Sequence, residues 1–378
     1  MKNLPDGWVI KLFDECIEKE ISANKLKIPQ NGFQVEGKYP IIDQGVEYIA
    51  GFTDDSSKIY NGELPVIIFG DHTRIFKFVD FPFALGADGT KILVPKKLLH
   101  PKYFYFFLNG LIIENHGYSR HFKFLKDKQI VIPPLPTQKK IAAILEKAEK
   151  LREWRKEADG LTDAFLKSTF LEMFGDPVSN PKGWEQGKLG DFFSDVRYGV
   201  STKSSSKGYP IIGMNSISYE GRIDWNNLSK VDLPPNIFQK EKLEKNDLLF
   251  NRTNASNLVG KTGIVDKEIE AVSASYLIRL RIKPSFQPYF VWYLMNSPFF
   301  KAIFTQKCKK AVNQANINSK ELAAFPAIFP PLPLQQKFAA IVQQVEQVRQ
   351  HQKESKEQID HFFNVLMQKA FSGELEAK

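Results

Sequence analysis

The sequence has little cysteine and no long apolar run. Its two cysteines, Cys16 and Cys308, lie in unrelated contexts, which favours neither a disulfide framework nor a cysteine metal site. No window reaches the roughly 18 apolar residues of a transmembrane helix, and residues 1–20 lack the apolar stretch of a signal peptide. We therefore expect a cytoplasmic protein with reduced cysteines and without a membrane partner.

Catalytic and metal-binding motifs are also scarce. The six histidines show no paired ligand spacing, so no metal site is expected. The sequence contains no N-P-P-Y or D-P-P-Y tetrapeptide of the kind found in amino-methyltransferases, and no glycine-rich cofactor loop after a strand. These gaps predict a noncatalytic chain that holds no cofactor of its own.

Two short patterns imitate catalytic sites. Residues 255–262 fit the phosphate-loop pattern A-x-x-x-x-G-K-T, but the strand-like residues 263–265 follow where a helix is required. Asp6 with Glu36 and Lys38 resembles the acidic pair and lysine of a nuclease metal site, a pattern short enough to arise by chance. We expect neither pattern to be functional.

The charge balance favours a polyanionic partner without proving one. The chain has 52 Lys and Arg against 43 Asp and Glu, a formal net charge of +9. Each basic side chain set against a phosphate releases condensed counterions, so such an excess suits nucleic acid. Many cytoplasmic proteins are equally basic, and the arrangement of the residues has to decide.

One passage of the sequence occurs twice. PPLPTQKKIAAILEKAE at 133–149 returns as PPLPLQQKFAAIVQQVE at 330–346, with 10 of 17 positions identical. Each copy begins a predicted helix, and the first of these helices continues to about residue 174. In the first helix, Thr137 is the expected N-cap and Gly160 is a possible point of interruption. Apolar residues recur at heptad spacing in both, as Ile141, Ile144, Ala148, Leu151, Ala158 and Phe165, and as Phe338, Ile341, Val345, Val348, Ile359, Phe362 and Leu366.

Two such helices can bury their apolar seams against each other instead of each serving only the core of its own domain. The repeat predicts an antiparallel coiled coil with a pseudo-twofold axis, whose register is fixed by the polar seam residues Arg155, Gln352 and Ser355.

The segments between the helices repeat each other more distantly. Gly-Trp opens both, at 7–8 and 183–184, and YPII occurs at 39–42 and 209–212. We expect an α+β protein: two mixed α/β domains separated by two long helices. The expected boundaries are residues 1–132 and 175–329 for the globular domains and 133–174 and 330–378 for the helical regions.

If the polyanionic partner is DNA, polar residues on loops between the predicted strands are the candidates for contact with its bases, because Asn and Arg make bidentate contacts to adenine and guanine edges. In the first domain these are Asp71, His72, Thr73, Arg74, Ser119, Arg120, His121 and Lys123. In the second they are Tyr198, Ser201, Thr202, Lys203, Asn251, Arg252, Thr253 and Asn254. For each residue, a hydrogen bond that stabilises a turn is an equally good interpretation, so the loops are better predicted than their members.

The complete layout resembles the specificity subunit of type I restriction–modification systems. The resemblance covers the whole chain and rests on both PPLP helices, with further motifs FGDHTR at 69–74, GADGT at 86–90, MFGDP at 173–177, RYGVSTKSS at 197–205 and NRTNASNLVGKT at 251–262.

The resemblance implies two target recognition domains that each read half of a split site on double-stranded DNA. It implies helices that set the distance between the halves and dock two methyltransferase subunits, with restriction and translocase subunits joining through the complex. S-adenosylmethionine, magnesium and ATP would belong to those partners.

Two other functions remain open from the sequence. One is a self-sufficient modification or restriction enzyme, and the other is a noncatalytic coiled-coil adaptor without a role at DNA.

Overall fold

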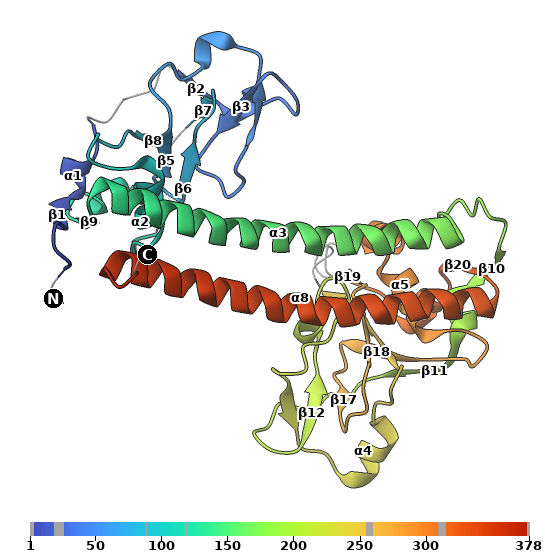
Figure 1. The fold of residues 1–378 in the computed structure, drawn as a ribbon. Helices are drawn as coiled ribbons and strands as arrows, with labels where there is room; N and C mark the ends of the chain where they lie inside the picture. The colour runs from blue at the N-terminus through green and yellow to red at the C-terminus, as the bar shows by residue number, and fades with distance from the viewer. Residues whose placement is uncertain are drawn as a thin grey trace. The chain divides into compact units, whose positions relative to one another are not determined.

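The computed structural model describes residues 4–18, 26–87, 89–117, 119–254, 260–308 and 315–375. The chain forms two compact units. Unit 1 consists of residues 1–157 and 353–378, and unit 2 consists of residues 158–352. The long helices α3 (Leu135–Phe174) and α8 (Leu332–Ser372) each contribute one end to each unit (Figure 1).

The described part of unit 1 contains three small sheets. The paired strands are β1 (Val9–Leu12) with β9 (Gln129–Ile132), β2 (Lys27–Ile28) with β7 (Ala84–Gly86), β3 (Tyr39–Ile42) and β4 (Gly51–Thr53), and β6 (Phe76–Val79) with β5 (Val66–Gly70) and β8 (Thr90–Leu93). Its short helices are α1 (Phe13–Cys16) and α2 (Pro101–Asn109). Phe104 of α2 and Phe13 of α1 stack in the core, at 6.1 Å between ring centroids.

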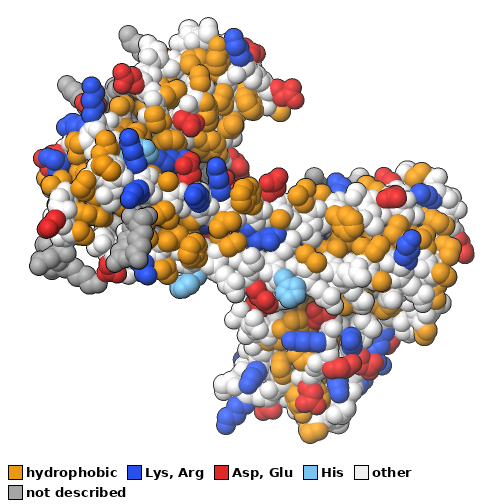
Figure 2. All heavy atoms as spheres, in the orientation of Figure 1, with side chains coloured by type: hydrophobic (Ala, Val, Ile, Leu, Met, Phe, Trp, Pro, Cys, Tyr) orange, Lys and Arg blue, Asp and Glu red, His pale blue; other side chains and the backbone are white. Residues whose placement is uncertain are grey.

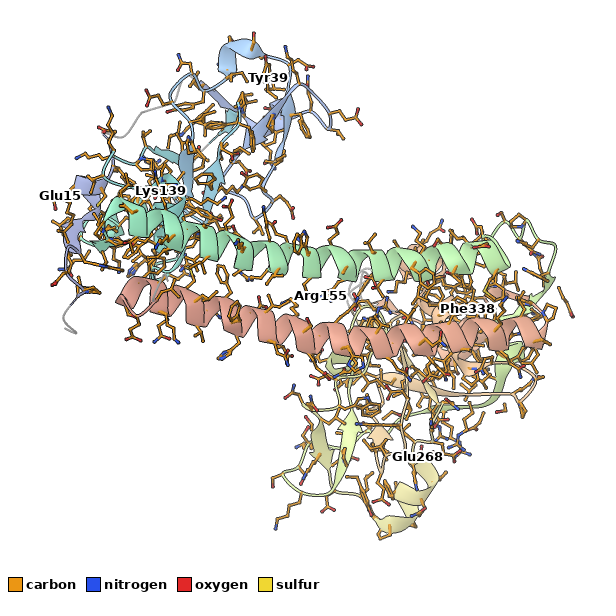
Figure 3. The ribbon with its side chains drawn as sticks, viewed as in Figure 1. Glu15, Tyr39, Lys139, Arg155, Glu268 and Phe338 are labelled. Carbon is orange, nitrogen blue, oxygen red and sulfur yellow. The ribbon has the colours of Figure 1, made fainter. Side chains whose placement is uncertain are left out.

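Unit 2 repeats this plan with additions. Its strands are β10 (Glu185–Lys188) with β20 (Pro326–Phe329), β11 (Phe193–Tyr198) with β18 (Leu277–Ile282), β14 (Leu248–Asn251) and β16 (Thr262–Ile264), β13 (Ser229–Val231) with β12 (Tyr209–Ile212) and β17 (Val272–Ser273), and β15 (Thr253–Asn254) with β19 (Ala315–Asn316). Its short helices are α4 (Pro235–Glu241), α5 (Pro288–Asn296), α6 (Pro298–Cys308) and α7 (Ser319–Ala323). The core of unit 2 includes Phe338 of α8, labelled in Figure 3.

A buried glutamine fixes the start of each long helix. Gln138 donates from Nε2 to the carbonyls of Pro133 (2.8 Å) and Leu98 (3.0 Å), and its Oε1 accepts from the backbone N–H of His100 (2.7 Å). Gln335 repeats the arrangement in unit 2: it donates to the Pro330 carbonyl (2.7 Å) and accepts from the Gln287 N–H (3.0 Å). Both side chains are 1% exposed, so each proline corner is tied to the N-terminus of the neighbouring short helix, α2 or α5.

The ends of the long helices are also built alike. Phe174 at the end of α3 packs on Phe290 of α5, and Phe371 near the end of α8 packs on Tyr103 of α2, at 4.9 and 5.7 Å between ring centroids. Gly175 then ends α3 with φ 74°, a conformation in which glycine is favoured because it has no Cβ. Each unit therefore holds the start of one long helix and the end of the other.

Within each unit the two helices pair antiparallel, as predicted (Figure 1). In unit 1 the Nε of Arg152 lies 2.7 Å from Oδ1 of Asp360. In unit 2 Arg349 forms an ion pair with Asp163, and Gln352 donates to Oγ1 of Thr162 (2.9 Å). The predicted α+β fold class with paired long helices is confirmed.

Details of the predicted helices need correction. α3 begins at Leu135, so Thr137 lies inside the helix and does not cap it, and the helix continues through Gly160. Four residues assigned to the apolar seam are about half exposed, namely Leu151 (40%), Phe165 (51%), Val348 (49%) and Phe362 (50%). Other seam residues are buried as predicted, namely Ile141, Ala148, Phe338 and Val345, and the helices also bury Leu145, Leu166, Val342 and Phe363, which the predicted seam left out. A heptad written for one seam places these residues wrongly because each helix packs on a globular domain as well as on its partner helix.

Candidate nucleic-acid interface

In unit 2, the sheet brings two predicted groups to one edge. β11 and β14 pair antiparallel with β18 on its two sides, so they run in the same direction and finish at the same end of the sheet, with Tyr198 opposite Ile278 and Asn251 opposite Leu277. The guanidinium of Arg252, which follows β14, lies 4.8 Å from the centroid of the Tyr198 ring. The sheet thus joins an arginine and a partly exposed tyrosine that lie 54 positions apart in the sequence.

The backbone of Arg252 is held by hydrogen bonds, whereas its guanidinium lies over the Tyr198 ring without them. Its N–H donates to the Tyr276 carbonyl (3.1 Å), and its own carbonyl accepts from the Ile317 N–H (3.0 Å). No hydrogen bond joins the guanidinium to another described residue, and its Nε is buried without a partner among them. A guanidinium has five N–H donors in a planar fork, so this group retains the donors that recognition of a guanine edge or a phosphate requires.

Three further polar side chains surround this pair. The hydroxyl of Tyr198 donates to Oγ of Ser319 (3.1 Å) and accepts from the Ser319 N–H (3.0 Å). Thr253 donates to Oδ1 of Asn316 (3.4 Å) across the β15–β19 pair. We name the group Tyr198, Arg252, Thr253, Asn316 and Ser319 the strand-end cluster. The sequence analysis missed Asn316 and Ser319, since they follow no predicted strand and only the fold brings them here.

The other residues predicted in unit 2 divide into exposed and structural ones. Ser201, Thr202 and Lys203 are exposed on the connection that follows Tyr198. Asn251 is fully buried, and its backbone bonds to Lys261 and Gly260 hold the start of the loop. The backbone of Asn254 pairs with Ala315.

In unit 1 the predicted group at 71–74 forms the turn between β5 and β6. Arg74 has φ 64°, and its N–H donates to the Gly70 carbonyl (2.7 Å). Thr73 donates from Oγ1 to the Gln44 carbonyl (2.6 Å), and Nη1 of Arg74 donates to the Ile113 carbonyl (2.9 Å). His72, Thr73 and Arg74 are partly exposed.

The second predicted group of unit 1 packs on this turn. His121 is fully buried, and its ring Nδ1 lies 3.0 Å from the Asp71 carbonyl; Asp71 is 2% exposed and accepts from the Phe122 N–H through Oδ1 (2.7 Å). We therefore assign Asp71 and His121 to joining the two loops, because buried side chains with internal partners do not meet a base. Ser119 is partly exposed, and Arg120 and Lys123 are exposed beside the join.

A buried lysine supports the loops of each unit. Lys77, on β6, donates from Nζ to the carbonyls of Asp43 (2.9 Å) and Glu47 (2.5 Å), just after the YPII strand β3. Lys261, directly before β16, donates to the carbonyls of Met214 (3.1 Å) and Ile217 (2.7 Å), after the YPII strand β12. Burial lowers the pKa of both lysines.

The Lys261 contacts also give the phosphate-loop pattern another role. Its lysine serves a structural clip, and its last residue, Thr262, begins the strand β16 where a phosphate loop needs a helix. Residues 255–259 of this pattern, like Asp88 of the GADGT motif, lie outside the described residues.

Charge on the surface is mixed. Figure 2 shows Lys and Arg over both globular parts of the drawn face, interspersed with Asp and Glu. Across the described ranges, no three His, Cys, Asp or Glu side chains gather as metal ligands would. None of the described helices combines the length and apolarity needed to cross a membrane.

Comparisons with known proteins agree with this architecture. The family model described as "Type I restriction modification DNA specificity domain" matches residues 5–158 and again 181–361. The putative type I restriction enzyme MjaX specificity subunit of Methanocaldococcus jannaschii is 32% identical over 167 residues, which are 43% of this chain and 39% of that protein. The EcoKI specificity subunit of Escherichia coli K12 is 24% identical over an alignment of 436 residues that covers 99% of this chain and 90% of that protein.

Solved structures share the fold. The crystal structure of a type I restriction–modification S subunit from M. genitalium aligns with a TM-score of 0.64 at 16% identity, covering 98% of this chain and 97% of that one. A chain from a study of assembly and conformational transition of the type I R-M system aligns with a TM-score of 0.55 at 17% identity, covering 99% and 100%. The match of the family model to both halves shows that this chain belongs to the family of type I restriction–modification specificity subunits.

Proposed function

We propose that the two units of this specificity subunit each read one half of a bipartite target on double-stranded DNA. The observation that carries the proposal is the strand-end cluster of unit 2, where a guanidinium without hydrogen bonds to other described residues lies over an aromatic ring at a partly exposed edge. A side chain held in this way reaches a base edge with little further loss of rotamer freedom, and an arginine fork suits the O6 and N7 atoms of guanine. The turn at 71–74 is the corresponding candidate in unit 1.

We further propose that the exposed lysines and arginines near these loops contact phosphates. Lys203 in unit 2 and Arg120 and Lys123 in unit 1 are exposed next to the candidate readers. Phosphate contacts fix the register of a protein on the duplex, while base contacts select the sequence. The remaining predicted residues, Ser201, Thr202, His72 and Ser119, are candidates for either kind of contact.

The helices are proposed to set the spacer and to dock two methyltransferase subunits. Support comes from features that occur once in each unit. The ion pair Arg152–Asp360 lies next to exposed Leu151 and Phe362, and the ion pair Arg349–Asp163 lies next to exposed Val348 and Phe165. Two similar surfaces suit two copies of one partner.

Restriction and translocase subunits would then join the complex in the cytoplasm. The chemistry and its cofactors, S-adenosylmethionine, magnesium and ATP, would reside in the partners.

Mapping methylated adenines in a genome that carries this subunit with its methyltransferase tests the proposal. The expected result is one motif made of two short half-sites around a gap of fixed length. Methylation at one contiguous site, or none that depends on this chain, would refute the bipartite reader.

Two further measurements address the alternatives. Binding of S-adenosylmethionine or cleavage of DNA by the purified chain alone would indicate a self-sufficient enzyme. Absence of salt-dependent retention on DNA would indicate an adaptor.

A further inference from the structure

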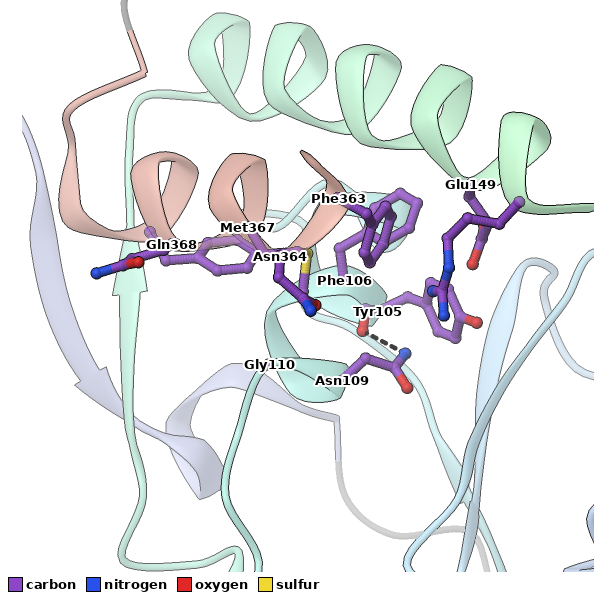
Figure 4. A pocket seen from close by; sticks show the side chains of 11 residues that line it. Tyr105, Phe106, Asn109, Gly110, Glu149, Phe363, Asn364, Met367 and Gln368 are labelled. Carbon is purple, nitrogen blue, oxygen red and sulfur yellow. Dashed lines mark hydrogen bonds between the residues drawn. The ribbon is translucent and has the colours of Figure 1, made fainter. Parts of the chain in front are cut away.

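A cavity of about 690 Å³ opens in unit 1 between α2, α3 and α8 (Figure 4). Its apolar wall includes Phe106 of α2 and Phe363 and Met367 of α8, while Glu149 of α3 and Asn109 of α2 supply polar atoms. Its lining combines aromatic rings with the carboxylate of Glu149 and the guanidinium of Arg152. Because Arg152 is paired with Asp360, the remaining carboxylate and the rings suit a cationic group that is attached to an apolar neighbour.

The carboxylate of Glu149 makes no hydrogen bond or ion pair with the described residues of unit 1. Burial raises its pKa, while the charges of Lys102 and Arg152 act in the opposite direction. Nearby Arg152 is occupied, since it pairs with Asp360 at 2.7 Å and lies 4.8 Å from the centroid of the Phe363 ring. Lys102 pairs with Glu146 at 3.5 Å. A half-buried carboxylate without a partner is costly, and a bound cation would remove the cost.

Unit 2 contains the same arrangement with its cation in place. The repeated passage puts Glu346 at the position of Glu149 and Arg349 at that of Arg152. Glu346 accepts from Nε (2.8 Å) and Nη2 (3.4 Å) of Arg222 and is also paired with Arg349. The carboxylate that is unpaired in unit 1 is therefore paired twice in unit 2.

The hairpin that carries Arg222 rests on the helix corresponding to α2. α2 and α5 both begin with proline and have nine residues, which places Trp292 at the position of Tyr105 and Asn296 at that of Asn109. Nε1 of Trp292 donates to the Gly221 carbonyl (3.1 Å), and a Cβ built on Gly221 would lie 2.6 Å from Nδ2 of Asn296. The tip of the hairpin thus covers the residues whose counterparts line the open cavity of unit 1.

Unit 1 cannot fill its cavity in the same way. The segment after β3, residues 43–50, reads DQGVEYIA and contains neither arginine nor lysine. Its Tyr48 donates its hydroxyl to the Phe78 carbonyl. The cation must therefore come from outside this segment.

We propose that the cavity of unit 1 binds an arginine side chain from a loop of the methyltransferase subunit that docks there, in the place that Arg222 takes in unit 2. The identity of the partner rests on the function proposed above, whereas the preference for arginine rests on Glu149 and on the occupied counterpart. A consequence is that two docked copies are not equivalent, because only the copy at unit 1 finds a free acceptor.

A peptide tests the preference for arginine without the partner. The probe is Ser-Tyr-Glu-Gly-Arg-Ile amide, the sequence of residues 218–223, with a control peptide that has glutamine in place of arginine. The full chain is labelled at its five methionine methyl groups, and Met367 in the cavity reports binding by NMR. We expect the arginine peptide alone to shift Met367, and Glu149→Gln to abolish the shift. Equal shifts with both peptides, or none at millimolar peptide, would overturn the proposal.

Titration with the methyltransferase subunit tests the partner. Glu149→Gln, which preserves the shape of the side chain, should weaken one of the two binding steps about tenfold, as expected for loss of a charged hydrogen bond. Glu346→Gln is the matched control and should leave both steps unchanged, because Arg222 already occupies that site. If the peptide binds and the titration is unaffected, the cavity accepts arginine but the assigned partner is wrong. If the chain proves not to recognise a specific DNA sequence, the proposed function is refuted, but binding of the arginine peptide to the cavity is unaffected.

Discussion

Units 1 and 2 share the buried side-chain contacts that hold their loops and helix starts, and they differ at the exposed ends of their strands. Gln138 and Gln335 share two contacts at the proline corners, one to a proline carbonyl and one from the N–H that precedes a short helix, and Lys77 and Lys261 hold corresponding loops. The strand ends differ: β5 turns directly into β6 through residues 71–74, whereas β14 leads into the longer connection that contains β15. The corresponding strands β1 and β10 also differ in sequence, since β1 reads VIKL and β10 reads EQGK.

The difference separates two kinds of constraint. The buried side chain of each glutamine or lysine bonds two or more backbone groups. Replacing the residue would leave those backbone groups buried without a hydrogen bond, so few other residues fit the position. Loops at strand ends carry no such constraint and can take other lengths and side chains while the framework persists. This division suits a protein with one assembly role and two independent recognition surfaces.

Changing the spacing between the units should have the largest effect. Four residues inserted in both helices at the boundary of the units, after Glu157 and after Gln352, add about 6 Å of helix with little rotation. Since a base pair advances about 3.4 Å, the methylated motif should keep its half-sites and gain one or two base pairs of gap. Methylation mapping reads the outcome directly.

A variant in which four residues at the same places are replaced by alanine, without insertion, is the control and should keep the original motif. Changed half-site bases around an unchanged gap would mean that the helices contribute to reading DNA instead of measuring distance.

The two glutamine clips should differ in strength. Gln138→Leu removes three hydrogen bonds from a buried site and should cost about 3–5 kcal/mol of the stability of unit 1, while Gln335→Leu removes two and should cost about 2–3 kcal/mol in unit 2. Hydrogen exchange of backbone amides in each unit measures the change. The exposed neighbour Lys139, labelled in Figure 3, gives the control Lys139→Ala. Equal costs in the two units would contradict the count of hydrogen bonds.

The recognition loops can be separated by substituting one arginine in each unit. Arg252→Ala should weaken specific binding by about 1–3 kcal/mol and relax the sequence of one half-site only. Arg74→Ala is the matched change for the other half-site, and Arg252→Lys should retain charge but lose the bidentate contact. Binding curves on specific and random DNA provide the measurement. A loss of equal size on both would identify a phosphate contact instead.

The sequence predicted the fold well because its strongest signals are local. The duplicated PPLP passage, followed each time by helix-forming residues with few glycines or prolines, indicated two long paired helices. The seam positions were partly wrong, since about half of each of the Phe165 and Phe362 side chains is exposed. Periodicity along one helix does not show how many neighbours that helix has.

The candidate site was predicted less completely. The turn at 71–74 and the segment at 251–254 were identified as loops because strands with buried patterns precede them. The pairing of Tyr198 with Arg252, and the presence of Asn316 and Ser319, depend on strand order in the sheet and on chain crossings that no local pattern shows. Likewise, the burial of Asp71 and His121 follows from two loops packing on each other.

The smallest expected effects on stability are at the two ion pairs between the helices, Arg152–Asp360 and Arg349–Asp163. The two pairs differ because Arg349 has a second acidic partner, Glu346. Asp360→Asn should cost about 0.5–1 kcal/mol, a typical value for partly exposed pairs, whereas Asp163→Asn should cost less because Arg349 keeps Glu346 as a second partner. Lys356 and Arg152 hold the pKa of Asp360 below its ordinary value. Its contribution is therefore present at neutral pH and is lost as the pH falls through that lowered pKa.

Denaturant unfolding of single and double variants at pH 7 measures both couplings, with Glu346→Gln as the decisive background. In that background Arg349 keeps only Asp163, so the cost of Asp163→Asn should rise toward that of Asp360→Asn. If Asp163→Asn costs the same with and without Glu346, the second partner gives no support, and the predicted difference between the two ion pairs has no basis in Glu346.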